Sequence, residues 1–227
     1  MARISDVRPI GEDAEELVRV TIESYDAAAE SFHDRYYDRL HLNRSIMLGL
    51  VMFVRELVAR GDPRAVLDVG CGPGEHAEFI ARTTSASVIG VDRSWGMLRV
   101  ARRRSEHVSV ARMDARQIAF PAETFDGILA SNVVHHLPRA QVAGFFTELR
   151  RVARPGCTLY VITKEGTSDS LLEGTRDAGL TMGPRYVSSF TRDELNEYAA
   201  TAGFTVHRSF TPEGGYVHLL AALPAVE

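Results

Sequence analysis

The residues that most clearly indicate a functional site in this 227-residue chain are concentrated in one glycine-rich stretch, "VLDVGCGPGEH", at residues 66–76. Its three glycines, Gly70, Gly72 and Gly74, stand at alternate positions directly after an apolar run. Glycine lets the backbone turn tightly and approach a ligand where any side chain would clash. A loop of this kind between a strand and a helix predicts a ligand site at the carboxyl end of the strand.

Three kinds of ligand compete for this loop. A pyrophosphate dinucleotide favours Gly-x-Gly-x-x-Gly, whereas the spacing here is Gly-x-Gly-x-Gly and the next residue, Glu75, would repel a phosphate at the helix N-terminus. A P-loop is excluded because no Gly-Lys-Ser/Thr sequence follows. Asp68 and Glu75 flank the loop, and Asp92 closes the next expected strand, where it could bind both ribose hydroxyls. These three carboxylates favour an adenosyl ligand with a cationic sulfonium amino-acid tail.

The elements that must position these residues follow from the pattern after residue 64, where short apolar runs alternate with helical patterns. The expected strands are 65–69, 87–91, 108–113, 125–130, 158–163, 205–209 and 216–222, and the expected helices are 75–81, 94–103, 139–152 and 192–202. Such alternation predicts βαβ units and a parallel sheet. The connection from Pro212 to Gly215 is too short for a helical crossover, so the last two strands should pair antiparallel. The expected fold class is therefore α/β, with a seven-stranded, mostly parallel sheet, an antiparallel last strand and helices on both faces.

Three further segments complete the expected organisation. Residues 1–63 contain two helical stretches and predict an N-terminal helical cap on a core over 64–227; the first stretch has an apolar stripe of Leu17, Val20, Tyr25, Ala28, Phe32 and Tyr36. These helices either cover a site or pack against the sheet without touching ligand. The loop-rich segment at about 164–190 is long enough for a lid insertion. Thr191 and Glu194 predict a capping box at the start of the last helix, and Gly203 its end.

Composition and charge narrow the class of protein. The chain is 45% hydrophobic and 25% charged, with a formal net charge of −4, which argues against a nucleic-acid partner. Only two cysteines occur, Cys71 and Cys157, so neither a disulfide framework nor a metal site is expected. The most apolar run, residues 46–54, is too short to cross a bilayer, and we expect a cytoplasmic protein without membrane association. The pattern leaves the oligomeric state open.

The motifs together resemble those of the class I S-adenosylmethionine (SAM)-dependent methyltransferases, small-molecule type, over nearly all of residues 64–222. "VLDVGCGPGEH" is similar to the glycine-rich first motif, "VIGVDRSWGML" to the second strand with its ribose-binding Asp92, and "VARMDARQIAFPAETFD" to the third motif. "FDGILASNVVHHLP" resembles the fourth motif, and "LRRVARPGCTLYVIT" the helix and strand that follow it. The resemblance implies a Rossmann-like fold, SAM as cofactor and transferase activity.

The resemblance also implies a cofactor-binding set, which comprises Asp68, Gly70, Gly72, Gly74, Asp92, Arg93, Met97, Asp114, Ala115 and Ser131. The glycines would admit the methionine part of SAM, Asp68 would orient its ammonium group, and Asp92 would bind the ribose. Asp114 with Ala115 would contact the adenine edge. Arg93 and Met97 would lie near the adenine, and Ser131 or Asn132 near the sulfonium. Helix or turn capping is the alternative role for Asp68 and Asp92.

Candidate catalytic residues are His135, Tyr25 and Asn132. His135 and His136 follow the fourth expected strand, so one of them could act as general base, although similar "HHLP" sequences in family members with unrelated acceptors imply a structural role for at least one. Tyr25 lies in "YDAAAESF", similar to the segment that folds an N-terminal helix over SAM, where its ring would face the sulfonium. A core aromatic is the alternative. Asn132 could bind the acceptor or the cofactor carboxylate; further pocket candidates are Tyr36, Tyr37, Tyr186 and Phe190.

The expected reaction is methyl transfer to a small organic metabolite, at an oxygen, nitrogen or carbon, by direct in-line displacement. Positioning would supply most of the catalysis. The chain lacks the Asn/Asp-Pro-Pro-Tyr/Phe motif that the family's exocyclic-amine enzymes use, which argues against a DNA or protein-glutamine acceptor. Two alternatives remain: an enzyme of this fold that uses SAM for cyclisation, either releasing methylthioadenosine or with SAM as an electrostatic aid, and a non-catalytic SAM-binding regulator.

Overall fold

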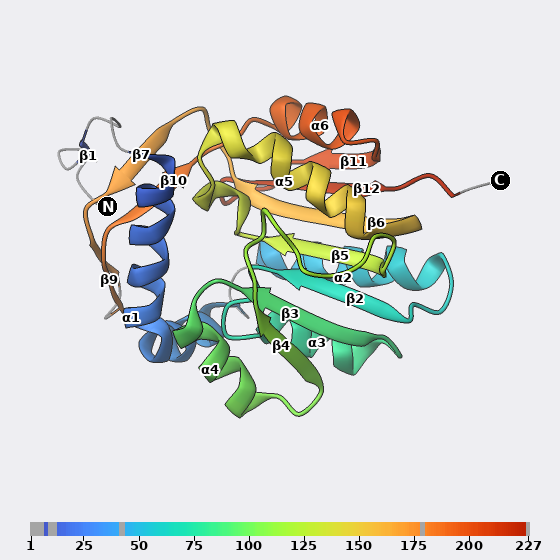
Figure 1. Cartoon of the computed structure of the whole chain (residues 1–227), viewed down its shortest axis with the longest axis horizontal. Coiled ribbons are helices and arrows are strands. Elements are labelled where there is room, and N and C mark those ends of the chain that lie inside the picture. Colours follow the sequence, from blue (N-terminus) through green and yellow to red (C-terminus); the bar gives the residue numbers. More distant parts are fainter. Residues whose placement is uncertain (1–6, 9–12, 41–43, 178–179, 226–227) are drawn as a thin grey trace.

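A seven-stranded sheet forms the centre of the computed structural model, which describes residues 7–8, 13–40, 44–177 and 180–225 (Figure 1). The strands are β2 (Ala65–Val69), β3 (Ser87–Asp92), β4 (Val108–Arg112), β5 (Phe125–Ser131), β6 (Ala153–Lys164), β11 (Thr205–Phe210) and β12 (Tyr216–Ala222). Their order is β11-β12-β6-β5-β2-β3-β4. All run parallel except β12, which lies between β6 and β11 and pairs antiparallel with both. The predicted fold class is confirmed.

Helices cover both faces of this sheet (Figure 1). They are α1 (Ala14–Leu40), α2 (Arg44–Ala59), α3 (Glu75–Thr83), α4 (Trp95–Arg104), α5 (Arg139–Val152) and α6 (Arg192–Thr201). Phe145, Phe146 and Leu195 of α5 and α6 are buried against one face, and Phe53 and Ile80 of α2 and α3 against the other. Because apolar side chains on one helical stripe must be buried against another layer, the helices that the pattern predicted form where it placed them.

The ends of α6 are formed as the sequence predicts. The Thr191 hydroxyl accepts a hydrogen bond from the Glu194 N–H at 3.2 Å, and the Glu194 carboxylate accepts one from the Thr191 N–H at 2.8 Å. The chain leaves the helix at Gly203, whose φ of +95° favours glycine. The capping box and the glycine stop are therefore confirmed.

The two N-terminal helices have different neighbours. Helix α1 crosses the carboxyl edge of the sheet and packs against α4 and against strand β10 (Arg185–Ser188). Helix α2 instead lies flat on the sheet, where Ile46, Leu50 and Phe53 meet Val66 of β2. Only α1 is therefore placed to cover the ends of the strands.

The segment at 164–190 contains short strands where the sequence suggested loops. β7 (Asp169–Leu172) pairs antiparallel with β10 and with β1 (Val7–Arg8), and β8 (Thr175–Asp177) pairs with β9 (Leu180–Met182). Strands of two to four residues are too short to show a period in the sequence, and β1 comes from the far end of the chain. Arg139 ties this segment to the core, because it binds Asp169 at 3.0 Å and Glu194 at 2.7 Å.

Both cysteines are buried free thiols. No group of three or more His, Cys, Asp and Glu side chains in the described ranges could hold a metal ion. None of the helices within those ranges combines the length and the hydropathy that a bilayer crossing requires.

Candidate active site

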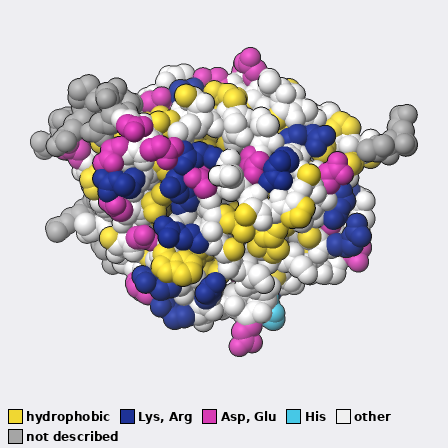
Figure 2. All heavy atoms as spheres, viewed as in Figure 1, with side chains coloured by type: hydrophobic (Ala, Val, Ile, Leu, Met, Phe, Trp, Pro, Cys, Tyr) yellow, Lys and Arg dark blue, Asp and Glu magenta, His cyan; other side chains and the backbone are white. Residues whose placement is uncertain are grey.

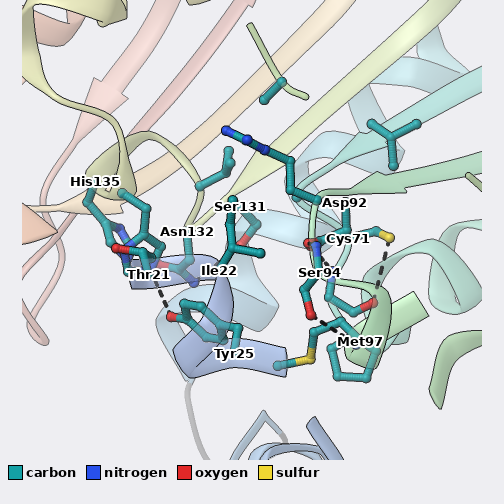
Figure 3. Close-up of a pocket in the computed structure, with 18 of the residues that line it drawn as sticks. Thr21, Ile22, Tyr25, Cys71, Asp92, Ser94, Met97, Ser131, Asn132 and His135 are labelled. Atoms are coloured by element: carbon teal, nitrogen blue, oxygen red, sulfur yellow. Dashed lines mark hydrogen bonds between the residues drawn. The ribbon is translucent and has the colours of Figure 1, made fainter. Parts of the chain in front are cut away.

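A cavity of about 280 Å³ lies beneath α1 at the carboxyl edge of the sheet. In Figure 3, Asp92 and Met97 mark one end of this cavity and Thr21 and His135 the other, with Tyr25 between them. The predicted residues that line it are Gly70, Gly72, Asp92, Arg93, Met97, Asp114, Ala115, Ser131, Tyr25, Asn132 and His135. The topology thus brings together residues from four strand ends and from the N-terminal helix.

The three glycines of the loop have different surroundings. Gly72 has a φ of +52°, and a Cβ built on it meets no atom within 4 Å, so the loop has open space where a ligand could approach. A Cβ on Gly70 would lie 2.7 Å from that of Val133, and one on Gly74 would lie 3.2 Å from that of Ala101. Gly74 does not line the cavity; it is the N-cap of α3, and its φ of +92° favours glycine.

Asp92 holds the glycine loop in place. One carboxylate oxygen accepts a hydrogen bond from the Gly72 N–H at 2.9 Å, and the other accepts one from the Ser94 N–H at 2.8 Å. Burial raises the pKa of Asp92, and these backbone hydrogen bonds oppose the shift. Each carboxylate oxygen has a second lone pair, so Asp92 can still accept hydrogen bonds from a ligand.

Asp68 lies behind the loop and not on the cavity wall. Its side chain is 1% exposed, and within the described residues neither oxygen makes a hydrogen bond of normal geometry to another side chain or to the backbone. Burial, followed by the nearby charges of Asp92 and Glu75, raises the pKa of Asp68 well above its usual range. A buried carboxylate without a strong partner favours a cation nearby.

Asp114 is held by two arginines. Arg116 donates to it from its backbone N–H at 2.9 Å and from its guanidinium at 2.7 Å, and Arg93 lies 3.1 Å away. Burial alone would raise the pKa of Asp114, but the hydrogen bonds of Arg116 and the charge of Arg93 outweigh it and lower the pKa. Arg116 also binds Glu15 of α1. The carboxylate that the resemblance assigns to adenine is thus already part of an ion-pair network at the cavity rim.

His136 connects Tyr25 to the backbone of β10. Its Nδ1 lies 2.8 Å from the Tyr186 carbonyl oxygen, and its Nε2 lies 2.7 Å from the Tyr25 hydroxyl. Since a carbonyl only accepts, Nδ1 carries the proton and Nε2 accepts from the tyrosine. Burial lowers the pKa of His136 to about 4 and raises that of Tyr25 to about 12, so both are neutral. The pair fixes the Tyr25 ring across the cavity.

His135 and Asn132 complete the wall at the end of β5. His135 is 9% exposed, and its Nδ1 has no hydrogen-bond partner among the described residues. Burial lowers the pKa of His135 well below its usual range, and the charges of His136, Lys164 and Arg185 add to this shift. Asn132 has a φ of +60°, which is uncommon for a residue other than glycine and is enriched at functional sites. Its backbone N–H donates to the Ile162 carbonyl at 2.8 Å.

Two anchors of α1 were not among the predicted site residues. One carboxylate oxygen of Asp26 accepts hydrogen bonds from the Ser94 hydroxyl at 2.6 Å and from the Gly96 N–H at 2.7 Å. His33 Nδ1 lies 2.6 Å from a carboxylate oxygen of Glu75, with both side chains buried. The position of Asp26 next to Tyr25 in "YDAAAESF" was a usable signal for the first anchor, whereas nothing in the sequence pairs His33 with Glu75.

The prediction that Tyr186 and Phe190 line the pocket was wrong. Tyr186 packs with Leu17 and Leu171, and Phe190 is fully buried in the main core beneath the Arg139 guanidinium. The short strands of this segment were not foreseen: Tyr186 pairs with Leu171 within β10 and β7, and Phe190 forms an isolated bridge with Glu165 beyond β10. The side chains of Tyr36 and Tyr37 lie outside the described residues.

Comparison of the sequence with known proteins gives a family match and a curated relative. Residues 66–156 match the model of a methyltransferase domain family. The methyltransferase GfsG of Streptomyces halstedii is 38% identical over 119 residues, which are 49% of this chain and 40% of that protein. The chain therefore spans less than half the length of this curated relative.

Solved structures share the fold over a longer stretch. The 1,6-didemethyltoxoflavin-N1-methyltransferase of Burkholderia thailandensis, solved with 1,6-didemethyltoxoflavin and S-adenosylhomocysteine (SAH), matches with a TM-score of 0.73 at 20% identity, over 96% of this chain and 94% of that one. The [4+2]-cyclase SpnF matches with a TM-score of 0.61 at 21% identity, over 78% of this chain and 80% of that one. At these identities the likeness concerns the fold.

Proposed function

We propose that this chain transfers the methyl group of SAM to a small organic metabolite; the match of residues 66–156 to a methyltransferase domain family and the shared fold support the resemblance to the class I SAM-dependent methyltransferases. The observation that carries the proposal is the single cavity that unites the glycine loop, Asp92 and Tyr25. We take the acceptor to be a small molecule, because the cavity lies beneath α1 and the formal net charge of −4 disfavours nucleic acid.

The residues present fit SAM. The open space at Gly72 admits the methionine part, and the free lone pairs of Asp92 suit the two ribose hydroxyls. Asp68 is buried behind the loop without a strong partner among the described residues, so it would orient the ammonium group through its charge or through a water molecule and not as part of the cavity wall. When bound, SAM supplies an electrophilic methyl group on a positively charged sulfur.

The chain's own residues then have three tasks. Helix α1 covers the site and excludes water, and the floor formed by Ser131 and Asn132 orients the reactants, which supplies most of the rate. The neutral ring of Tyr25 offers an aromatic face to a cation. Where the acceptor carries a proton that must leave, His135 is the proposed base, because its Nδ1 has no hydrogen-bond partner among the described residues and the residue lines the end of the cavity away from Asp92.

Mass spectrometry of the purified protein with SAM, with and without a small-metabolite extract, tests the proposal. Formation of SAH that depends on the extract, together with a product heavier by one methyl group, is expected. The Asp92→Ala variant should abolish it, because the loop and the ribose contact are lost together. Gly144→Ala in α5, where a Cβ meets no atom within 4 Å, is the matched control. Absence of SAH from every extract would contradict the proposal.

A second candidate, cyclisation with SAM, is kept because a [4+2]-cyclase shares the fold. The same experiment separates the two. Methylthioadenosine formed without extract would make SAM itself the substrate of an intramolecular cyclisation. An altered extract metabolite without SAH would instead indicate a cyclase that uses SAM only as an electrostatic aid.

A further inference from the structure

We propose that Asp26 is a positioning residue, whose carboxylate fixes α1 on the amino end of α4 and thereby sets the place of the Tyr25 ring in the cavity. This inference rests on the proposed methyl transfer for its kinetic test. It concerns a residue that does not itself line the cavity but binds Ser94, which does.

The first support is the hydrogen bonding of Asp26. A single carboxylate oxygen accepts from the Ser94 hydroxyl at 2.6 Å and from the Gly96 N–H at 2.7 Å. Ser94 is itself the N-cap of α4 and accepts from the Met97 N–H at 3.1 Å. The first N–H groups of a helix lack partners within the helix, and the helix dipole favours a negative charge there. Asp26 therefore acts as a second cap on α4, supplied by a different helix.

The second support is the close packing between α1 and α4. A Cβ built on Gly96 would lie 2.7 Å from the Asp26 carbonyl oxygen, 3.0 Å from its Cα and 3.1 Å from the Ala29 Cβ. Contacts under 3.0 Å to backbone cannot be relieved by a side-chain rotation, so the helices meet at this distance only because residue 96 is glycine. The Asp26 hydrogen bonds and the Gly96 contact thus define one seam between α1 and α4.

The third support is that this seam is continuous with the proposed cofactor contacts. The Ser94 N–H donates to Asp92, and Asp92 accepts from the Gly72 N–H, so hydrogen bonds run from α1 to the glycine loop. Tyr25, one residue before Asp26, is held from the other side of the cavity by His136. Helix α1 is therefore fixed at both ends of the cavity, and loss of Asp26 would release one of them.

Other ion pairs of α1 are poorer candidates for this role. Figure 2 shows acidic and basic side chains side by side over α1 and α4. One ion pair between these two helices joins Glu30 to Arg103, and their side chains are 74% and 57% exposed. Exposed ion pairs contribute little. Asp26 is half-buried and binds helix N–H and hydroxyl donors, so its contribution should dominate the seam.

The test compares three variants with two controls. Asp26→Ala removes the carboxylate, Asp26→Asn keeps an acceptor oxygen at the same place, and Gly96→Ala pushes the helices apart without touching Asp26. The controls are Glu23→Gln, which removes an exposed charge of α1 that pairs only with Arg19 among the described residues, and Gly144→Ala.

Three measurements are made on each variant. Affinity for SAH is measured by calorimetry, and kcat and KM are measured with the methyl acceptor recovered from the extract. Fluorescence of Trp95, the only tryptophan of the chain, reports the seam directly because it lies between Ser94 and Gly96.

We expect Asp26→Ala to lower kcat by about tenfold, the order expected when a hydrogen bond to a charged group is lost. It should also weaken SAH binding and change Trp95 fluorescence. Asp26→Asn should recover most of the activity, and Gly96→Ala should reproduce the Asp26→Ala defect. Combining the two should add little, because both open one seam. If Asp26→Ala fails to fold, Gly96→Ala and Asp26→Asn still decide the question.

Two results would overturn the proposal, and they are distinguishable. A wild-type protein that binds no SAH contradicts the proposed function, and the positioning role with it. A wild-type protein that binds SAH and methylates an acceptor, but whose Asp26→Ala and Gly96→Ala variants match the two controls in kcat and SAH affinity, contradicts the positioning role alone.

Discussion

Adjacent histidines at the end of β5 are in different states although their ring centroids are 4.2 Å apart. His136 is held at both nitrogens, by the Tyr186 carbonyl and the Tyr25 hydroxyl, and its tautomer is fixed. His135 has an Nδ1 without a partner among the described residues. Two adjacent histidines therefore differ in what they can do: one is held at both ring nitrogens, and the other lines the cavity with one nitrogen available for a further hydrogen bond.

A pair of Tyr25 variants separates the ring from its hydroxyl. Tyr25→Phe keeps the aromatic face and loses only the hydrogen bond to His136, so SAH affinity should change by less than about threefold. Tyr25→Ala should weaken SAM binding more than SAH binding, because only SAM carries the sulfonium charge that a ring face attracts. Calorimetry with both ligands measures the difference. Equal losses for SAM and SAH would show that the ring acts by packing alone.

The pH profile follows from the buried histidines. Burial lowers the pKa of His136 to about 4 and that of His135 well below its usual range, so both are neutral at pH 7. Between pH 6 and pH 8, kcat/KM should therefore show no histidine titration. Steady-state rates across this range, with an acceptor that does not itself titrate, measure the profile. A transition near the ordinary histidine pKa of about 6.5 would contradict the buried, neutral assignment.

At the scale of elements, the strands and helices of the α/β core could be predicted from the sequence, whereas the neighbours of α1 and α2 and the short strands β1 and β7 could not. In the strands and helices of the βαβ units, apolar residues recur at regular spacing over many residues, and the loop motifs lie between these elements. The local sequence pattern was therefore sufficient to predict them. Helix α2 packs on the sheet, whereas α1 packs on α4 and β10. An apolar stripe in the sequence shows that a helix is buried on one side but does not reveal which element covers it. β1 and β7 are very short and pair across most of the chain length. For the site, residue type and motif indicated Asp92 and Tyr25, whereas the pairing of His33 with Glu75 depends on tertiary structure alone.

The capping box of α6 gives a stability prediction at this scale. Thr191→Ala removes the hydroxyl that accepts from the Glu194 N–H and should lower the free energy of unfolding by about 1 kcal/mol. Thr191→Ser retains the oxygen and should cost much less. Urea unfolding followed by circular dichroism measures both. Equal losses in the two variants would indicate that the threonine methyl group, and not the cap, stabilises the helix.

At the scale of the whole molecule, a buried polar network fastens α2 to the sheet. His218 of β12 is fully buried, with Nε2 2.8 Å from the Ser45 hydroxyl and Nδ1 3.1 Å from that of Tyr160. Gly49 leaves room for this network, because a Cβ there would lie 2.9 Å from His218 Nδ1. Buried polar groups are tolerated when each finds a partner, so the network fixes where α2 lies on an otherwise apolar face.

This network predicts how stability depends on pH. Burial lowers the pKa of His218 to about 4, below its unfolded value of 6.5, so the unfolded chain takes up the proton first as the pH falls. Stability is therefore lost below about pH 6.5, and between pH 7 and pH 5 His218 should account for about 1–2 kcal/mol of the loss. Denaturation of the wild type and of His218→Gln at both pH values isolates this share, because the other titrating groups are common to both proteins. A parallel loss in the two proteins would contradict it.

The place of β12 has a consequence for how the chain is made. β11 joins the sheet only through β12, and β12 (Tyr216–Ala222) follows all the other strands of this sheet in the sequence. Synthesis proceeds from the amino end, so β2 to β6 emerge from the ribosome long before the strand that pairs with the free edge of β6. That edge must stay unpaired until β12 has been synthesised, and an exposed edge is where nascent chains pair wrongly with one another. A ribosome that stalls shortly before residue 216 would thus release an α/β core in which the edge of β6 is unpaired and prone to aggregation.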